Sequence, residues 1–233
     1  HLRRPRVERW ARDVILDVRD GAPAPPDSPV RAVAFHREPD GSLMDPAIAA
    51  VELINLLRPT VAVGRFVVGA AHALHEHPHL RQELAAGDDA VLERFAQEVR
   101  RFYPFIPMLG GKALEPFAWR GRRFPTGTWL LLDVFDTDRD RRSWDDPDAF
   151  RPEQFRDWDG NPFSLVHQGG GDAATNHRCP GERAAIELTK RAARLLTAAT
   201  TYDVPPQDLA IDLGRMPAKP ASGFVMANVR ATG

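Results

Sequence analysis

The feature that most restricts the fold is a segment, residues 46–75, whose apolar side chains would cover nearly every face of a helix. Asp45-Pro46 stands at its start, and this pair favours helix initiation because aspartate accepts hydrogen bonds from free amides and proline suits the first helical position. A helix that is hydrophobic all round is buried, so we expect a central helix in the protein interior. Pro59 lacks an amide hydrogen, and we therefore expect the helix to bend there.

Composition and charge restrict the partners and the compartment. The 31 basic and 32 acidic side chains almost cancel, which gives no electrostatic reason to expect nucleic acid or an anionic membrane as a partner. Arg58 and Arg65 interrupt the apolar segment, so we expect no transmembrane helix. The single cysteine, Cys179, cannot form an intrachain disulfide, and no signal-peptide pattern is seen, so we expect a cytoplasmic protein.

Hydrophobic periodicity and turn residues place the remaining elements. Residues 136–176 should form a long irregular stretch, and stretches of that length in a compact domain are usually functional. A proline-rich linker is expected at residues 22–29. The patterns predict a mainly α-helical fold with small β-sheets, with helices at 5–19, 30–37, 78–86, 89–102 and 181–199, a hairpin through 117–124, and strands at 129–135, 209–213 and 224–229.

Two short motifs place charged residues in positions that can interact. Glu98 and Arg101 are three residues apart on a predicted helix, so they share a face. Residues 150–155 read FRPEQF and put Arg151 next to a proline and between aromatic side chains. Taken alone, the first motif indicates a solvated ion pair and the second a turn with an aromatic anchor.

A third motif surrounds the cysteine. Residues 168–172 read QGGGD, and residues 177–181 read HRCPG directly before a predicted helix. The loop lacks the lysine and serine of a phosphate-binding loop, but its glycines allow the backbone to pass close to a flat group. The helix start and the basic residues His177 and Arg178 favour the thiolate form of Cys179.

The order and spacing of the three motifs resemble the cytochrome P-450 superfamily. The resemblance covers nearly the whole chain and implies that residues 1–233 are the C-terminal, haem-binding part of a single domain, whose N-terminal half we expect in a longer protein. It implies haem b as the cofactor, with the thiolate of Cys179 as axial ligand to the iron. The resemblance also implies that Gln168, Gly169 and His177 contact the cofactor, with His177 near a propionate.

The same resemblance assigns a structural role to the charged motifs. It implies that Glu98, Arg101 and Arg151 form a buried ion network that fixes the irregular stretch against the haem loop. Such a network would replace the solvated ion pair that the first motif indicates by itself.

The central helix departs from the usual pattern of the superfamily. Most members carry an acid or amide beside a threonine there, and the pair delivers protons to bound oxygen. Residues 56–60 read LLRPT, so a permanent cation, Arg58, occupies this place and Pro59 replaces the threonine. Thr60 comes one residue later, about 100° further around the helix. Arg-Pro, together with QGGGD and HRCPG, resembles the bacterial fatty-acid peroxygenases of the superfamily, which use hydrogen peroxide and need no redox partner.

Physical chemistry agrees with this second resemblance. An isolated guanidinium in an apolar helix is costly unless an anion pairs with it. The carboxylate of a free fatty acid can accept a bidentate pair from Arg58, and Pro59, Ala62, Phe105 and Met108 suit its chain. The bound carboxylate could then take a proton from peroxide and return it to the leaving oxygen. The product would be a 2- or 3-hydroxy acid, or a terminal alkene after decarboxylation.

Several alternatives stay open at this point. Arg58-Pro59 could be a helix kink with an internal salt bridge. The protein could be a reductase-dependent monooxygenase in which Thr60 is displaced but functional, or the chain could be a non-catalytic fragment. We interpret the histidines between residues 72 and 79 as a solvated helix end, and the acidic residues of 136–148 as a solvated loop, because neither has the spacing of a metal site.

Overall fold

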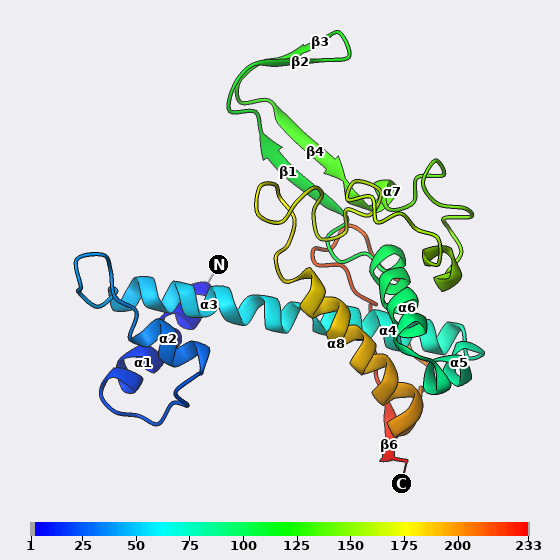
Figure 1. The fold of residues 1–233 in the computed structure, drawn as a ribbon, viewed down its shortest axis with the longest axis horizontal. Helices are drawn as coiled ribbons and strands as arrows, with labels where there is room; N and C mark the ends of the chain where they lie inside the picture. Colours follow the sequence, from blue (N-terminus) through cyan, green and yellow to red (C-terminus); the bar gives the residue numbers. More distant parts are fainter. Residues whose placement is uncertain (1–2, 233) are drawn as a thin grey trace. The chain divides into compact units, whose positions relative to one another are not determined.

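The chain divides into two compact units, His1–Ala62 and Val63–Gly233, in a computed structural model that describes residues 3–232 (Figure 1). The described residues are mainly helical and contain three small antiparallel sheets of two strands each. This confirms the predicted fold class. That the two units form one domain stays a prediction.

The N-terminal unit is a small group of three helices. They are α1 (Arg3–Arg19), α2 (Pro29–Ala34) and α3 (Pro46–Ala62). The starts are close to the predicted ones, but α2 ends before the predicted residue 37, where Arg37 instead bridges to Leu43. Ala11 and Ile15 of α1 pack with Ala49 and Leu53 of α3 in a buried cluster. The guanidinium of Arg19 donates to the carbonyls that end α2 and precede α3, which ties the connecting segments to α1.

The apolar segment is two helices rather than one bent helix. The helix α3 continues past Pro59 to Ala62, and α4 (Gly64–Glu76) begins after Val63. The interruption therefore falls four residues after the expected position. Thr60 donates its hydroxyl to the carbonyl four residues earlier, and Gly64 has a low helix propensity, so both favour a break one turn beyond the proline.

The expectation that this segment is buried on every face is wrong for α3. Only three of its residues are buried, whereas Leu56, Leu57 and Val61 are exposed, Val61 to 77 %. The reason is that the N-terminal unit supplies only α1 and α2 to cover it. By length and composition alone Pro46–Glu76 could cross a membrane, but core helices of soluble proteins meet the same criteria. The cytoplasmic location stays a prediction.

Four helices build the centre of the C-terminal unit. These are α4, α5 (Leu80–Ala86), α6 (Asp89–Phe102) and α8 (Glu182–Arg194), and a π-helical turn, Leu195–Ala199, prolongs α8 to the predicted end. Leu74 of α4 and Phe95 of α6 belong to one buried cluster with Ala193 of α8 and Phe150 of the irregular stretch. The helix α6 thus lies at the centre of this core, with its last two turns almost fully buried.

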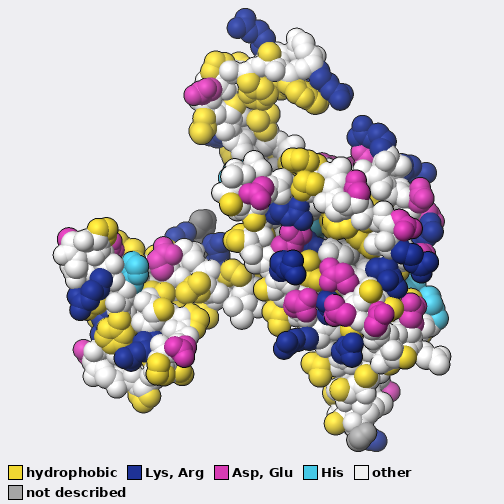
Figure 2. Space-filling model, in the orientation of Figure 1, with side chains coloured by type: hydrophobic (Ala, Val, Ile, Leu, Met, Phe, Trp, Pro, Cys, Tyr) yellow, Lys and Arg dark blue, Asp and Glu magenta, His cyan; other side chains and the backbone are white. Residues whose placement is uncertain are grey.

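The three sheets only partly follow the predicted strands. The predicted hairpin is β2 (Phe117–Trp119) with β3 (Arg122–Phe124), and the predicted strand at 129–135 is β4 (Trp129–Asp133), followed by a short helix α7 (Val134–Thr137). The partner of β4 is β1 (Met108–Lys112). The sequence did not predict this strand because two adjacent glycines interrupt its apolar pattern. Apolar side chains of both strands are exposed, and hydrophobic patches are visible over this region in the upper part of Figure 2.

The C-terminal strands were predicted less well. Residues 209–213 form no strand, and Ile211 makes only an isolated bridge to Pro220, which has no amide to extend a ladder. The sheet instead pairs β5 (Thr200–Asp203) with β6 (Ala227–Ala231), so only the later part of the predicted strand at 224–229 is present.

The irregular stretch after α7 is ordered by side chains. Trp144, Phe155 and Leu165 form a separate buried cluster, and the indole of Trp144 donates to the carbonyl of Ser164 at 3.0 Å. A 3-10 turn, Pro152–Phe155, holds the FRPEQF motif. A long stretch with little regular structure is therefore packed against α6 rather than mobile in solvent.

Candidate functional site

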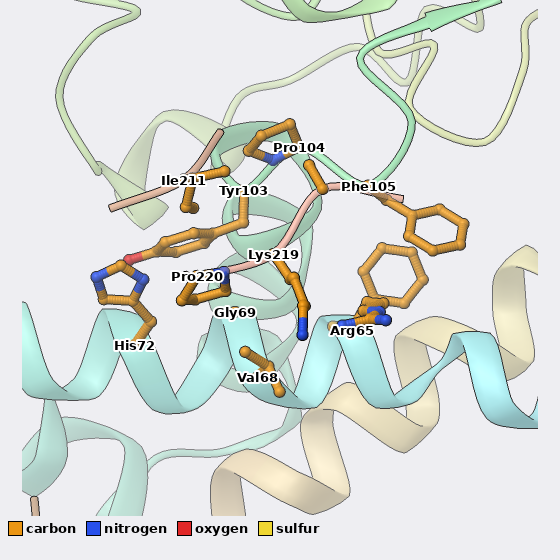
Figure 3. A pocket seen from close by; sticks show the side chains of 12 residues that line it. Arg65, Val68, Gly69, His72, Tyr103, Pro104, Phe105, Ile211, Lys219 and Pro220 are labelled. Atoms are coloured by element: carbon orange, nitrogen blue, oxygen red, sulfur yellow. The ribbon is translucent and has the colours of Figure 1, made fainter. Parts of the chain in front are cut away.

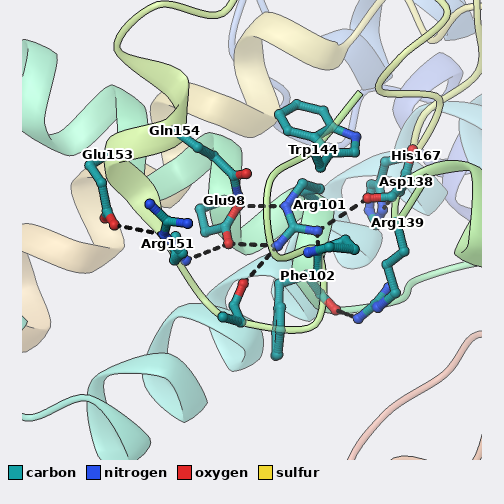
Figure 4. A network of polar contacts seen from close by, with 12 residues as sticks. Glu98, Arg101, Phe102, Asp138, Arg139, Trp144, Arg151, Glu153, Gln154 and His167 are labelled. Carbon is teal, nitrogen blue, oxygen red and sulfur yellow. Dashed lines mark hydrogen bonds and ion pairs between the residues drawn. The ribbon is translucent and has the colours of Figure 1, made fainter. Parts of the chain in front are cut away.

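The centre of the site is a buried ion pair on α6. Arg101 donates from Nε and Nη2 to the two carboxylate oxygens of Glu98, each at 2.7 Å, and both side chains are 0 % exposed. The remaining guanidinium hydrogens bond the carbonyls of Asp138, Pro147 and Ala149 (Figure 4). A bidentate pair with every donor satisfied is the geometry in which a buried charge is tolerated. The pair fastens the irregular stretch to α6.

Arg151 contributes its backbone to this network and not its side chain. Its amide donates to Glu98 Oε1 at 2.7 Å, while its side chain is 40 % exposed and its Nε lies 3.1 Å from Glu153 Oε1. The amide group of Gln154 takes the inward place and donates to Glu98 Oε2 at 2.8 Å. The prediction of a buried Arg151 guanidinium is therefore wrong. Each oxygen of Glu98 already accepts two hydrogen bonds, from Arg101 and from either the Arg151 amide or Gln154, so no acceptor site is left for the Arg151 guanidinium.

Cys179 lies in a loop that its own backbone closes. The amide of Cys179 donates to the carbonyl of Gln168 at 2.8 Å, and the amide of Glu182 donates to the carbonyl of Cys179 at 3.2 Å. Glu182 is the first residue of α8, so the half-buried free thiol stands just before a helix start. The bond between Cys179 and Gln168 thus brings the HRCPG motif against the first residue of the glycine-rich motif.

Two glycines make this closure possible. Gly169 has a φ of +93°, and a Cβ there would lie 1.7 Å from the carbonyl oxygen of His177. Gly171 has a φ of +80°, and its Cβ would lie 2.5 Å from the side-chain oxygen of Asn176. Any other residue at either position would push the two sides of the loop apart. The side chain of His177 is exposed at the loop surface.

A second buried cation, Arg100, was missed by sequence reasoning. Its side chain is 1 % exposed, and its Nε donates to Gln168 Oε1 at 3.0 Å while its two terminal nitrogens bond Gln97 and Glu182. Glu182 also accepts from Arg178. Burial lowers the pKa of Arg100, and Glu182 opposes that shift. Burial raises the pKa of Glu182, but the hydrogen bonds and charges of Arg178 and Arg100 outweigh it and hold the pKa low.

A buried acid and a buried histidine lie on the other side of the loop. Asp138 accepts from the amide of Val166 at 2.7 Å, and its Oδ2 lies 3.8 Å from Nδ1 of His167; both side chains are 2 % exposed. Burial raises the pKa of Asp138 to about 7, while burial and the cations Arg100 and Arg139 lower the pKa of His167 to about 3. The 3.8 Å distance would be an ion pair only with a protonated imidazole, and full burial favours the neutral form instead.

This pair yields a testable pH dependence. Between about pH 4 and 6.5 folding binds a proton at Asp138 and releases one at His167, so the two contributions to stability oppose each other. In Asp138→Asn only the histidine contribution is left, and the unfolded histidine binds a proton that the folded one does not. The free energy of unfolding of the variant, relative to the natural protein, should therefore rise with pH by about 1.4 kcal/mol per pH unit. Denaturant titrations across this range measure it, and parallel pH profiles would contradict it.

The predicted substrate residues lie in different parts of the chain. Arg58, Pro59 and Ala62 are in the last turns of α3, where Arg58 is exposed and makes no ion pair with the described residues of the N-terminal unit. The internal salt bridge that we considered for Arg58 is therefore not found within that unit. Met108 is an exposed residue of β1, and Phe105 is half-buried in the segment between α6 and β1.

Phe105 lines a small cavity between α4, the end of α6 and the C-terminal segment. Figure 3 shows Arg65 and His72 of α4, Tyr103, and Lys219 around it. His72 has its Nδ1 buried with no hydrogen-bond partner among the residues that the structure describes, and its ring lies 5.0 Å from that of Tyr103. The cavity places Phe105 beside cationic side chains, but neither Ala62 nor Met108 lines it.

Comparisons with known proteins agree with this arrangement. The sequence pattern of the cytochrome P-450 family matches residues 90–197. Rhazimal synthase of Alstonia scholaris is 30 % identical over 173 residues, which are 63 % of this chain and 34 % of that protein. Cytochrome P-450 71D18 of Mentha gracilis is 33 % identical over 94 residues, which are 39 % of this chain and 18 % of that protein. This chain therefore spans about a third or less of each of these relatives.

Solved structures match over the full chain. A variant of cytochrome P-450SP alpha (CYP152B1) is 45 % identical with a TM-score of 0.89, covering 100 % of this chain and 57 % of that one. A variant of cytochrome P-450 OleT in complex with arachidonic acid is 42 % identical with a TM-score of 0.87, covering 99 % of this chain and 55 % of that one. This chain spans somewhat more than half of both.

The helical core, the Glu–Arg pair of α6 and the glycine-closed cysteine loop are those of a haem-thiolate protein, and the chain belongs to the cytochrome P-450 family. Within the family it is similar over its whole length to the CYP152 type, which confirms the resemblance predicted from its motifs. The family and these neighbours imply haem b with a thiolate ligand as the cofactor.

The residues present fit such a group. Cys179 is the only cysteine of the sequence, its thiol is half-buried at a helix start, and Gly169 and Gly171 let the loop around it close tightly on itself. Within residues 3–232 no three His, Cys, Asp or Glu side chains gather as ligands for a bare metal ion. A single soft thiolate donor is what a haem iron takes from the protein.

Proposed function

We propose that the protein is a peroxygenase that uses hydrogen peroxide to oxidise free fatty acids near the carboxyl end. The product is a 2- or 3-hydroxy acid, or a terminal alkene formed by decarboxylation. The observation that carries the proposal is Arg58 followed by Pro59 in α3, on a helix whose neighbouring side chains are apolar. The activity belongs to the whole protein, of which we expect an N-terminal half in addition to this chain.

Cys179 is assigned as the iron ligand, with Gln168, Gly169 and His177 beside the cofactor. The assignment is supported by the bond from the Cys179 amide to Gln168 and by the close approach of Gly169 to the His177 carbonyl, because both contacts gather these residues around Cys179. Bound haem supplies the iron at which peroxide is activated. The residues of the chain orient the thiol, hold the loop closed and keep the backbone close to the place of the cofactor.

Arg58 is assigned as the anchor of the substrate carboxylate. Its guanidinium has no acidic partner among the described residues of its own unit. Two of its N–H groups can therefore bind the two oxygens of a substrate carboxylate at the same time. The held carboxylate stands in for the acid–base group that residues 56–60 lack. A solved CYP152-like relative, OleT, was obtained with arachidonic acid, which is itself a carboxylic acid. Pro59, Ala62, Phe105 and Met108 are assigned to the fatty-acid chain.

The position of Thr60 disfavours the reductase-dependent alternative. Its hydroxyl donates to the carbonyl of Leu56 at 3.2 Å and so has a partner within its own helix. A bond to the carbonyl four residues earlier is the common arrangement of a helical threonine, so its place is what disfavours this role: Thr60 lies about 100° around the helix from the position of the usual threonine. In the proposed mechanism the substrate carboxylate, and not the helix, handles the proton.

The choice of oxidant tests this function. We expect the complete protein to convert fatty acid with hydrogen peroxide alone, and to form no product with a ferredoxin reductase system when catalase removes leaked peroxide. No redox partner is needed because the peroxide already carries both oxidising equivalents. Gas chromatography of the products measures the two rates. Turnover confined to the ferredoxin system with catalase would establish the monooxygenase instead, and a haem-loaded protein inactive with both would establish a non-catalytic one.

A further inference from the structure

We propose that Arg100 and Glu182 form a clamp that holds the loop of Cys179 in its ligating shape. The inference rests on the proposed role of Cys179 as the iron ligand and names two positioning residues for it. We call the set of Arg100, Glu182 and Gln168 the loop clamp. Neither charged residue belongs to the Glu98–Arg101 pair, and the two residues of the clamp's ion pair are 82 positions apart in the sequence.

The contacts join both ends of the loop to one guanidinium. Arg100 donates from Nε to the side chain of Gln168 at 3.0 Å and from Nη2 to the carboxylate of Glu182. Gln168 is also the residue whose carbonyl receives the amide of Cys179, and the amide of Glu182 donates to the carbonyl of Cys179. The cysteine is thus bonded through its backbone to the two residues that Arg100 holds by their side chains.

The charges make Glu182 indispensable to this arrangement. Arg100 is 1 % exposed, and Arg178, next to the cysteine, bonds the same carboxylate. Two cations therefore share one anion, which leaves a net charge of +1 on the three groups. Without the carboxylate a buried cation would stand uncompensated beside a second cation. The repulsion would act on Arg178 and so directly on the residue before Cys179.

The clamp is separate from the pair that fastens the irregular stretch. Arg100 and Arg101 are adjacent on α6, so their side chains leave the helix about 100° apart. Arg101 reaches the carbonyls of Asp138, Pro147 and Ala149, whereas Arg100 bonds Gln168 of the cysteine loop, Glu182 at the start of α8 and Gln97 of its own helix. Loss of the clamp should therefore change the ligation of the iron more than it changes the packing around the stretch.

The test uses the complete protein loaded with haem. Glu182→Gln keeps the shape of the side chain and removes its charge, and Arg183→Gln, at an exposed position of the same helix, is the matched control. Two quantities are measured, the share of reduced carbon-monoxide complex with the red-shifted Soret band of thiolate ligation, and the rate of haem transfer to apomyoglobin. Cys179→His supplies the spectrum of a complex without thiolate.

Glu182→Gln should lose haem at least about tenfold faster and show a reduced thiolate band, because one member of a buried charged set is gone. The control should match the natural protein in both. If Glu182→Gln does not accumulate, Gln168→Ala decides, since it leaves the ion pair intact. It should lose haem about tenfold faster or more, as expected for a lost hydrogen bond to a charged group.

The outcomes separate the clamp from the function on which it rests. Natural protein without a thiolate-type band would overturn the role of Cys179. A natural protein with that band, and a Glu182→Gln or Gln168→Ala variant with the same band and haem loss within twofold of it, would overturn the clamp alone. If Glu182→Gln lost thermal stability but kept the same share of complex with the thiolate-type band, the clamp would likewise be overturned, because Arg100 and Glu182 would then stabilise the fold without positioning Cys179.

Discussion

Arg58→Ala should lower fatty-acid oxidation by about 10²-fold or more, which is the contribution of a positioned acid–base group. The variant loses both the anchor of the carboxylate and, with it, the group proposed to handle the proton of the peroxide. Arg58→Lys should recover only part of the activity, because a point ammonium cannot reproduce the planar fork. The initial rate with peroxide and a saturating fatty acid measures the effect, and the haem spectrum should stay that of the natural protein.

A short carboxylic acid provides the control for this mechanism. An acid too short to fill the substrate site should bring an acid–base group to Arg58 and allow oxidation of a guest molecule that has no carboxylate. It should do so in the natural protein and not in Arg58→Ala. Arg12→Ala removes an exposed cation of α1 in the same unit and should leave the oxidation of fatty acid within a few-fold. Similar activity in Arg58→Ala would mean that Arg58 is only a structural cation near a helix break.

Glu98→Ala should prevent the accumulation of soluble, haem-loaded protein. The substitution leaves the guanidinium of Arg101 in the interior at 0 % exposure without its counter-charge, and it removes the acceptor of the Arg151 amide and of Gln154. Breaking a buried pair in this way costs about 3–5 kcal/mol, which is a large share of the stability of a typical protein. Soluble yield, the ratio of haem to protein and denaturant midpoints measure the loss.

Arg151→Ala is the matched control for the buried pair. Among the described residues its side chain bonds Glu153 alone, and its backbone amide would still donate to Glu98. An exposed ion pair contributes about 0–1 kcal/mol, so this variant should express normally with full haem content. If both substitutions lowered the soluble yield and haem content equally, the Arg151 guanidinium would belong to the network after all. Normal expression of Glu98→Ala would show that the Glu98–Arg101 pair contributes little to stability.

The elements that the sequence predicted well depend on local patterns. The spacing of apolar residues predicted α1, α5, α6 and α8, and the Gly-rich and HRCPG motifs predicted a tight loop before a helix start. The Glu98–Arg101 contact needed only the geometry of one helix, in which residues three apart are neighbours. In contrast, β1 contains two adjacent glycines and became a strand only because β4 lies beside it.

By itself, then, the sequence determined the type of each local element, the motif order that marks the family, and the single residue able to donate a thiolate, Cys179. Only the tertiary structure decided which charges far apart in the sequence meet and which charged side chains are buried. It turned Arg151 outward, brought Arg100 against Glu182, and buried Asp138 beside His167. The physical reason is that helical and turn geometry fixes neighbours within a few residues. Contacts across many residues depend on how packed segments exclude water, and that exclusion decides which charged groups are buried and must find partners.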